Sequence, residues 1–129
     1  MSLVTPVIID GNIAILQLDG RLTLGEPSNE LRNAVLGQIA NGRTRIGLVT
    51  ENVPYIDSSG WGILVFAFTA ASKAGGQLVL IRPNRSIVKT GTMNNLIQIY
   101  KRFDSVDAAV AYLKQEKLET LGRKQGSTP

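Results

Sequence analysis

The chain has 129 residues, of which 43% are apolar, and it carries a formal net charge of +4 with no histidine and no cysteine. This length supports one domain with a single core, and the missing residue types exclude disulfides, thiolate or imidazole metal sites and a histidine-based catalytic triad. Nucleophilic catalysis would need a lysine or a carboxylate in place of histidine, and carboxylates alone could hold only a hard cation such as magnesium.

The basic charge is not clustered in the way that a nucleic-acid surface requires. From residue 114 onward, four basic and two acidic side chains supply half of the net charge. The rest of the chain has no run of lysine or arginine, and its seven aromatic residues offer no stacking platform. We expect no nucleic-acid partner.

The N-terminus does not resemble a targeting segment. The stretch MSLVTPVIID has no basic region, and a proline and an aspartate interrupt its apolar residues. The longest strongly apolar run, residues 63–71, is far shorter than the ~20 residues that cross a bilayer. We expect a cytoplasmic protein without direct membrane insertion.

Two strands and a helix are predicted in the first third of the chain. Apolar runs on both sides of Asp10-Gly11 predict an antiparallel hairpin, because this residue pair favours a tight turn with positive φ. A helix is predicted over residues 27–39, since Pro27 suits its first turn and Asn41-Gly42 suits its end.

The middle of the chain predicts a parallel crossover. Residues 45–51 and 77–81 have the apolar composition of buried strands, and residues 58–74 between them predict a long core helix that ends at Gly75-Gly76. A strand, a helix and a second strand in one sheet form a right-handed unit with parallel strands.

The last third predicts two more helices and a short strand. Asn84 is the expected cap of a short helix, residues 97–103 hold a possible fifth strand, and Asp104 is the expected cap of a helix over residues 105–115. The alternation of strands and helices predicts an α/β fold with a mixed sheet. We place one domain at residues 1–118 and a flexible tail at residues 119–129.

The stretch YIDSSGWG, residues 55–62, joins the third strand to the core helix. Its aspartate and serines are good helix caps, and a cap near Ser58 is a sufficient structural explanation. However, one cap does not need both serines, and Gly60 and Gly62 each cost about 1 kcal/mol inside a helix. The glycines indicate either close packing on the sheet or the close approach of a partner.

A phosphate would suit this corner, because a helix N-terminus offers unpaired N–H groups and partial positive charge. Ser58 is therefore a candidate phosphoacceptor. Other chemistries fit less well. Neither serine has the Gly-x-Ser-x-Gly spacing of a hydrolase, no second carboxylate is placed to hold magnesium beside Asp57, and the glycine-rich nucleotide motifs are absent.

The sequence VPYIDSSGWGILVFAFTAASKAGGQLVLI, with LDGRLTLGEPSNELRNAV upstream of it, resembles the STAS domain of sulfate transporters and anti-sigma-factor antagonists. The likeness covers residues 3–115, and Asp-Ser-Ser-Gly after a strand is its most specific mark. It looks more like the free-standing bacterial antagonists than like the transporter-attached form. The resemblance implies a four- to five-stranded mixed sheet with about four helices packed mainly on one face.

The resemblance also implies a switch protein that is not an enzyme, and we expect no cofactor and no metal. In such antagonists the serine after the aspartate, here Ser58, is phosphorylated by an anti-sigma factor that is an ATP-dependent serine kinase, and a PP2C-type phosphatase reverses the modification. The unmodified form binds the kinase and frees the sigma factor. The expected contact surface comprises Asp57, Ser58, Ser59, Gly60, Trp61 and Gly62, with Thr23 and Gly25 from the upstream loop.

Two positions depart from the family pattern. Val49 stands near the end of the third strand, where members often carry Asp or Asn, and Trp61 replaces the usual aliphatic residue. The indole either packs in the core or anchors an interface. Two other functions remain open: a STAS subunit that holds the ATPase of a membrane transport complex, and a domain that binds phosphate or nucleotide at the helix N-terminus.

Overall fold

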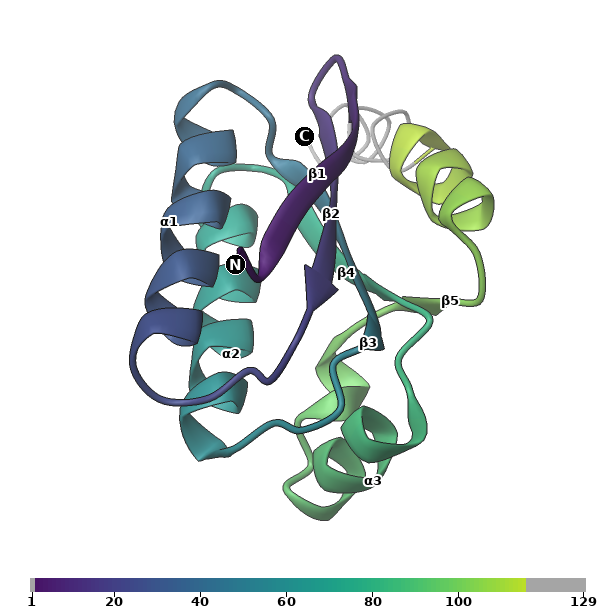
Figure 1. Cartoon of the computed structure of the whole chain (residues 1–129). Coiled ribbons are helices and arrows are strands. Elements are labelled where there is room, and N and C mark those ends of the chain that lie inside the picture. Colours follow the sequence, from purple (N-terminus) through teal and green to yellow (C-terminus); the bar gives the residue numbers. More distant parts are fainter. Residues whose placement is uncertain (1, 116–129) are drawn as a thin grey trace, which may run out of the picture.

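A five-stranded sheet with the order β1-β2-β3-β4-β5 forms the centre of the computed structural model, which describes residues 2–115 (Figure 1). The strands are β1 (Val4–Asp10), β2 (Ile13–Asp19), β3 (Arg45–Asn52), β4 (Gln77–Ile81) and β5 (Arg102–Phe103). β1 pairs antiparallel with β2, and all later neighbours are parallel. The predicted α/β class with a mixed sheet is confirmed.

The helices lie close to their predicted positions. They are α1 (Glu26–Ala40), α2 (Ser58–Lys73), α3 (Arg85–Met93), the 3-10 turn η1 (Ile97–Ile99) and a C-terminal helix described over residues 106–115. No helix in the described part of the chain is long and apolar enough to span a membrane. The predicted domain boundary at residue 118 and the predicted tail at residues 119–129 lie outside the described residues.

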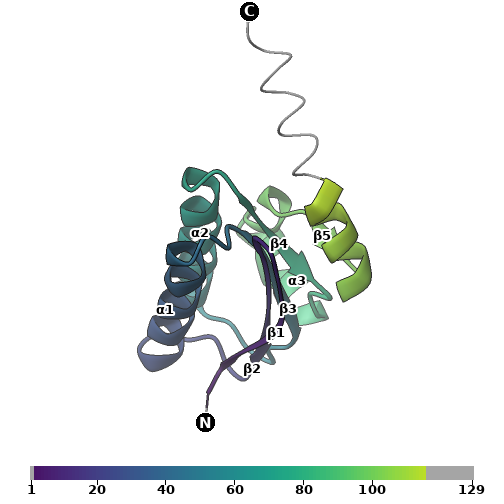
Figure 2. The same ribbon diagram turned by 90° about the horizontal axis from the view of Figure 1, so that it is seen from above.

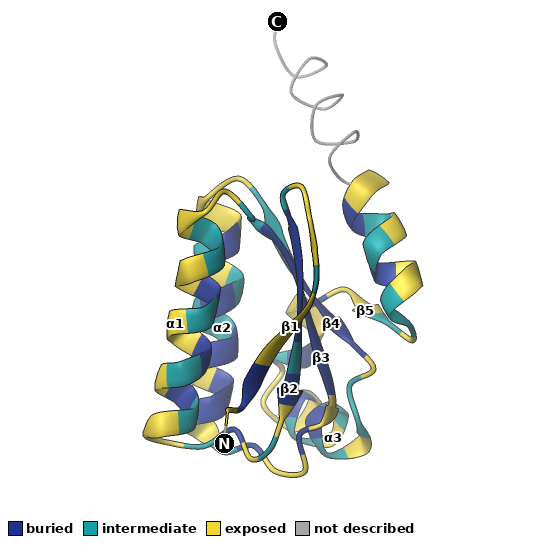
Figure 3. Cartoon of the chain, turned by 45° about the horizontal axis from the view of Figure 1, so that its top comes forward, coloured by how far each residue is buried: buried dark blue, intermediate teal, exposed yellow. Residues whose placement is uncertain are grey.

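Figure 2 shows α1 and α2 together on one face of the sheet and the C-terminal helix on the other. The larger core lies between the sheet and α1 and α2, where leucines of the three central strands meet the apolar sides of both helices. A smaller core joins the opposite sheet face to Ala109 and Leu113. In Figure 3 the buried residues accordingly face inward, while the outer faces of α1 and α2 are exposed.

The predicted hairpin is present, with a loop one residue later than expected. Asp10 pairs with Ile13, so the loop residues are Gly11 and Asn12, and Gly11 has the positive φ of +60°. This agrees with turns that need a positive φ only at their first central position. The register of β1 on β2 shifts between Pro6 and Ile8, which places a β-bulge in this edge strand.

Two details of the C-terminal third differ from the prediction. The fifth strand is only two residues long, because η1 occupies the first part of the predicted segment. Ser105, not Asp104, caps the last helix: its hydroxyl accepts a hydrogen bond from the Ala108 N–H at 3.1 Å. Asp104 still belongs to the turn after β5, where its carbonyl accepts a hydrogen bond from Arg82 Nε at 3.1 Å.

The parallel strands β2, β3 and β4 all end at the same edge of the sheet, the edge that faces the bottom of Figure 1. The loops that follow them lead into α1, α2 and α3, so these three helices begin at this edge. In open α/β sheets, ligands bind at the carboxyl ends of the strands. The YIDSSGWG stretch lies at this edge.

Candidate functional site

Two loops that are distant in sequence meet at the start of α2. An isolated parallel bridge pairs Leu22, in the loop after β2, with Ile56, in the loop after β3. The Leu22 N–H donates to the Tyr55 carbonyl at 2.9 Å, and the Asp57 N–H donates to the Leu22 carbonyl at 3.3 Å. The loop that carries Thr23 and Gly25 is thereby fixed beside the α2 N-terminus, as the predicted contact surface requires.

Asp57 is the residue that holds this junction together. It is the N-cap of α2, and its Oδ1 accepts a hydrogen bond from the Gly60 N–H at 2.8 Å. Its Oδ2 accepts a second hydrogen bond, from the Leu24 N–H at 3.1 Å. These N–H donors, with that of Gly60 contributing most, lower the pKa of the Asp57 carboxyl group below its ordinary value. Asp57 is therefore ionised at neutral pH and joins α2 to the Leu24 loop.

Ser58 is the first residue of α2 rather than its cap, and it is exposed. Because Asp57 supplies the cap, the Ser58 hydroxyl is not needed to begin the helix. It makes no hydrogen bond with any other residue that the structure describes. The neighbouring Ser59 is half-buried. Of the two serines, Ser58 is the one whose hydroxyl is freely presented to solvent.

The two glycines of the corner have different roles. A Cβ atom at Gly60 would lie 2.2 Å from the Leu22 carbonyl oxygen and 2.7 Å from Ile56 Cγ1, so close packing requires a glycine there. A Cβ atom at Gly62 would have no atom within 4 Å, and this residue is exposed. Internal packing therefore explains Gly60 and leaves Gly62 unexplained.

The structure excludes Trp61 from the accessible surface that the sequence predicted. The side chain is 3% exposed, and its Nε1 donates a hydrogen bond to Thr90 Oγ1 at 3.0 Å. Its ring lies 6.5 Å from that of Tyr100, between α2 and the segment that follows α3. Trp61 is a core residue because its position on α2 turns it toward α3. Gly60 is buried as well, so neither residue is accessible to a partner.

The loop before α1 contributes a surface that sequence reasoning described only in part. Gly25 is exposed with φ of +96°, and the Thr23 carbonyl accepts a hydrogen bond from Ser28 Oγ at 2.7 Å. Between these two predicted residues, Leu24 is 76% exposed and was missed. The sequence held one signal for Leu24: it is an apolar residue in a loop, directly before the Gly-Glu-Pro start of a helix.

A groove of about 430 Å³ extends from this loop along the contact between α1 and α2. Leu24, Gly25, Ser59 and Gly62 lie at the end nearest Ser58. Farther along, Arg32 places its guanidinium 4.7 Å from the centre of the Phe66 ring. The sequence did not indicate Arg32 or Phe66, since they lie on different helices and meet only through the packing of α1 on α2.

Val49, which we expected to stand in place of a polar residue near Ser58, does not lie at this corner. Val49 is buried in the smaller core, on the sheet face that packs against the C-terminal helix. β3 continues to Asn52, and its polar end consists of Glu51 and Asn52. The end of β3 thus lies three residues beyond Val49, although it is only one residue beyond the predicted strand 45–51.

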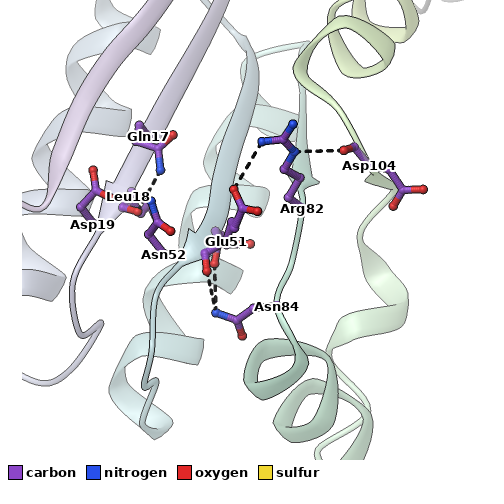
Figure 4. Close-up of polar contacts among 9 residues, drawn as sticks. Gln17, Leu18, Asp19, Glu51, Asn52, Arg82, Asn84 and Asp104 are labelled. Atoms are coloured by element: carbon purple, nitrogen blue, oxygen red, sulfur yellow. Dashed lines mark hydrogen bonds and ion pairs between the residues drawn. The ribbon is translucent and has the colours of Figure 1, made fainter.

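Figure 4 shows how the polar end of β3 is held. Asn52 Nδ2 donates a hydrogen bond to Asp19 Oδ1 at 2.9 Å, and Arg82 Nη1 pairs with Glu51 Oε1 at 3.3 Å. Asn84 Nδ2 donates to the backbone carbonyls of Glu51 and Val53, at 3.1 and 2.6 Å. These contacts join the ends of β2, β3 and β4 to one another and to the start of α3.

Comparison with known proteins agrees with this architecture. The family model described as "STAS domain" matches residues 5–109. A Thermotoga maritima protein named "Putative anti-sigma factor antagonist" is 27% identical over 112 residues, which cover 86% of this chain and 98% of that protein. A homologous protein of Thermotoga neapolitana is 28% identical and matches 81% of this chain and 93% of its own length.

Solved structures show the same arrangement. The crystal structure of a protein with the same name from Thermotoga maritima superposes with a TM-score of 0.77 at 26% identity, over 86% of this chain and 94% of that one. The anti-sigma factor antagonist SpoIIAA of Bacillus, in its phosphorylated form, superposes with a TM-score of 0.67 at 18% identity, over 84% and 97% of the two chains. The family model covers most of the sequence and the fold agrees, so the chain belongs to the STAS domain family.

Proposed function

We propose that this STAS-domain protein is a cytoplasmic anti-sigma factor antagonist, switched by phosphorylation of Ser58. The observation that carries the proposal is the exposed Ser58 hydroxyl, which is free of hydrogen bonds with the described residues and lies at the first position of α2. The names of the Thermotoga relatives support the antagonist role. In this proposal the protein has no catalytic activity of its own.

The proposed partner is an anti-sigma factor that is also an ATP-dependent serine kinase. It docks on the exposed part of the corner, which consists of Asp57, Ser58, Ser59 and Gly62 with the Thr23–Gly25 loop. The bare Cα of Gly62 allows the partner's backbone to approach closely. Binding of the unmodified protein to the kinase releases the sigma factor.

Phosphorylation then weakens this complex. The Ser58 oxygen attacks the γ-phosphorus of the kinase-bound ATP, the bond to the β-phosphate oxygen breaks, the hydroxyl proton passes to a base on the kinase, and ADP leaves. The product carries a charge of about −1.5 to −2 beside the ionised Asp57. A loss of about 3 kcal/mol in such an interface lowers affinity by about two powers of ten.

The domain can carry this phosphate without a change of fold. Ser58 Oγ holds no described residue in place, and the N-terminus of α2 favours a negative group. SpoIIAA, which shares the fold, has been solved in both phosphorylated and unphosphorylated forms. We further propose that a PP2C-type phosphatase hydrolyses the phosphate ester and restores the binding form.

The test is incubation with candidate anti-sigma kinases and ATP, followed by mass spectrometry of the intact protein. We expect one phosphate on the wild type, none on Ser58→Ala, and one on the matched control Ser59→Ala. A phosphate that persists on Ser58→Ala contradicts the assigned site. If no kinase-type anti-sigma factor of the organism modifies or binds the wild type, the proposed function is wrong.

A further inference from the structure

The second half of the molecule is strongly asymmetric in charge. From Ser58 to Phe103 the chain has six basic residues and neither aspartate nor glutamate. This segment contains α2, β4, α3, η1 and β5. Its cations therefore have no acidic partner within the segment, and Arg82 reaches its partner Glu51 only across the sheet edge.

Two of these cations share the outer face of α3 with an apolar side chain. Ile87 and Gly91 are the buried residues of this helix, whereas Arg85, Lys89 and Met93 follow one another at steps of four on the exposed side. Met93 is 76% exposed, as much as Leu24. We call the stripe of Arg85, Lys89 and Met93 the α3 face.

The α3 face is not arranged for the stability of the helix. Arg85 is the first helical residue, where positive charge opposes the helix dipole, and no acidic residue occupies the first turn. Neither Arg85 nor Lys89 forms an ion pair with another described residue. The stability of the helix therefore does not explain Arg85, which leaves it available for a role in recognition.

The helix that carries the α3 face lies next to the proposed docking corner. Trp61, in the first turn of α2, donates its hydrogen bond to Thr90 of α3, and a Cβ atom at Gly91 would lie 2.7 Å from the indole ring. The buried side of α3 thus contacts the start of α2 through the Trp61 side chain, and the α3 face lies on the exposed, opposite side of the helix. Both helices begin at the end of the molecule shown at the bottom of Figure 1. Leu24 lies on the other side of Ser58's helix start, bound to Asp57.

We propose that the α3 face is a second part of the docking surface for the anti-sigma kinase, and that the kinase meets it with an acidic surface around an apolar pocket for Met93. This inference rests on the proposed function. Unpaired cations around an exposed apolar side chain are complementary to carboxylates around such a pocket. Leu24 and Met93 would then be the two apolar anchors on either side of Ser58.

The first experiment locates the partner by photo-crosslinking in cells of the source organism. A benzophenone amino acid replaces Met93, Leu24 or, as a control, the partly exposed Leu36 on α1. We expect the variants at 93 and 24 to form an adduct with the same ATP-binding protein and the variant at 36 to form none. An adduct at 24 alone overturns the inference and leaves the proposed function standing. The absence of adducts at 93, or an adduct with a second copy of this chain, also overturns it.

The second experiment measures the affinity of the purified partner for charge variants. The double variant Arg85→Glu/Lys89→Glu should bind about tenfold or more weakly, with the difference shrinking at high salt. Lys73→Glu, an exposed cation at the far end of α2, should bind like the wild type. Equal losses for both variants would show a general charge effect and contradict the proposed surface.

Thermal unfolding separates recognition from folding. Arg85→Glu places a favourable charge at the start of α3, so its melting temperature should equal or exceed that of the wild type while its affinity falls. A lower melting temperature would show that Arg85 supports the fold and would contradict the proposed role. If the α3 face binds the partner but Ser58 is never phosphorylated, the surface is correct and the switch is wrong.

Discussion

The helices α2 and α3 begin at the same edge of the sheet with the same cap geometry, yet their caps are joined to different parts of the molecule. Asp57 Oδ1 accepts from the Gly60 N–H at 2.8 Å, and Asn84 Oδ1 accepts from the Ile87 N–H at 3.0 Å. The second oxygen of Asp57 accepts from the Leu24 N–H, whereas the amide nitrogen of Asn84 donates to carbonyls at the end of β3. A carboxylate has two oxygens that accept, so aspartate suits a cap that has a second N–H beside it. An amide also donates, so asparagine suits a cap that has carbonyls beside it.

The third residue of the helix differs between α2 and α3, and a substitution there in α2 has the largest expected effect on stability. Ile87 buries a full side chain, but Gly60 has no room for a Cβ beside the Leu22 carbonyl. We expect Gly60→Ala to destabilise the protein by about 3 kcal/mol or more, because rigid backbone would have to move. Urea denaturation measures this effect.

Gly62→Ala is the matched control for that change. It has open space for its Cβ, so it should raise stability by about 0.5–1 kcal/mol through better helix propensity. If Gly60→Ala unfolds at the same urea concentration as Gly62→Ala, the close packing of α2 against the Leu22 loop is not as described.

A substitution of Asn84 tests why the cap of α3 carries an amide group. Asn84→Asp keeps the acceptor for the Ile87 N–H but replaces the donor that binds the carbonyls of Glu51 and Val53. A carboxylate facing these carbonyls should cost about 2–3 kcal/mol in the free energy of unfolding. Asn84→Ser, which loses the same donor without adding charge, should cost less. Equal costs would show that repulsion from the carbonyls is unimportant.

Exchanging the cap of α2 should have a smaller effect that depends on pH. The pKa of Asp57 is lowered in the folded protein, so its stabilising contribution is complete above its ordinary value of 3.8 and is lost as pH falls through the lower folded value. Asp57→Asn should therefore be less stable than the wild type at neutral pH, and the difference should shrink below about pH 4. Urea midpoints of both proteins between neutral and acidic pH measure it. A difference that stays constant into acid would contradict an ionised cap.

Local signals sufficed to place most of the elements and the start of α2. Asn84 was predicted as a cap and is one, because its side chain acts within its own turn. The errors arose where distant residues decide. Asp104 was preferred to Ser105 as a cap, yet Arg82 from the end of β4 binds the Asp104 carbonyl and holds it in the turn. Val49 was expected near the site because it lies close to the end of the strand, but it is buried on the sheet face that packs against the C-terminal helix.

The exposed part of the candidate site was harder to predict than its location. Whether Trp61 is buried depends on Thr90 and Gly91, which lie about thirty positions later in the chain. Position 60 requires a glycine because the Leu22 carbonyl, in the loop after β2, lies too close for a Cβ atom. Sequence patterns report on neighbours along one helix or strand, and these contacts join separate elements.

The β-bulge in β1 has a consequence for the behaviour of the protein at high concentration. An unpaired strand edge invites another chain to add to the sheet, and Val7 and Ile9 on this edge are each about half exposed. The bulge between Pro6 and Ile8 interrupts the regular spacing of hydrogen-bonding groups, and Pro6 has no N–H to offer. The opposite edge, β5, has only two residues. Both borders of the sheet are therefore poor templates for fibril growth.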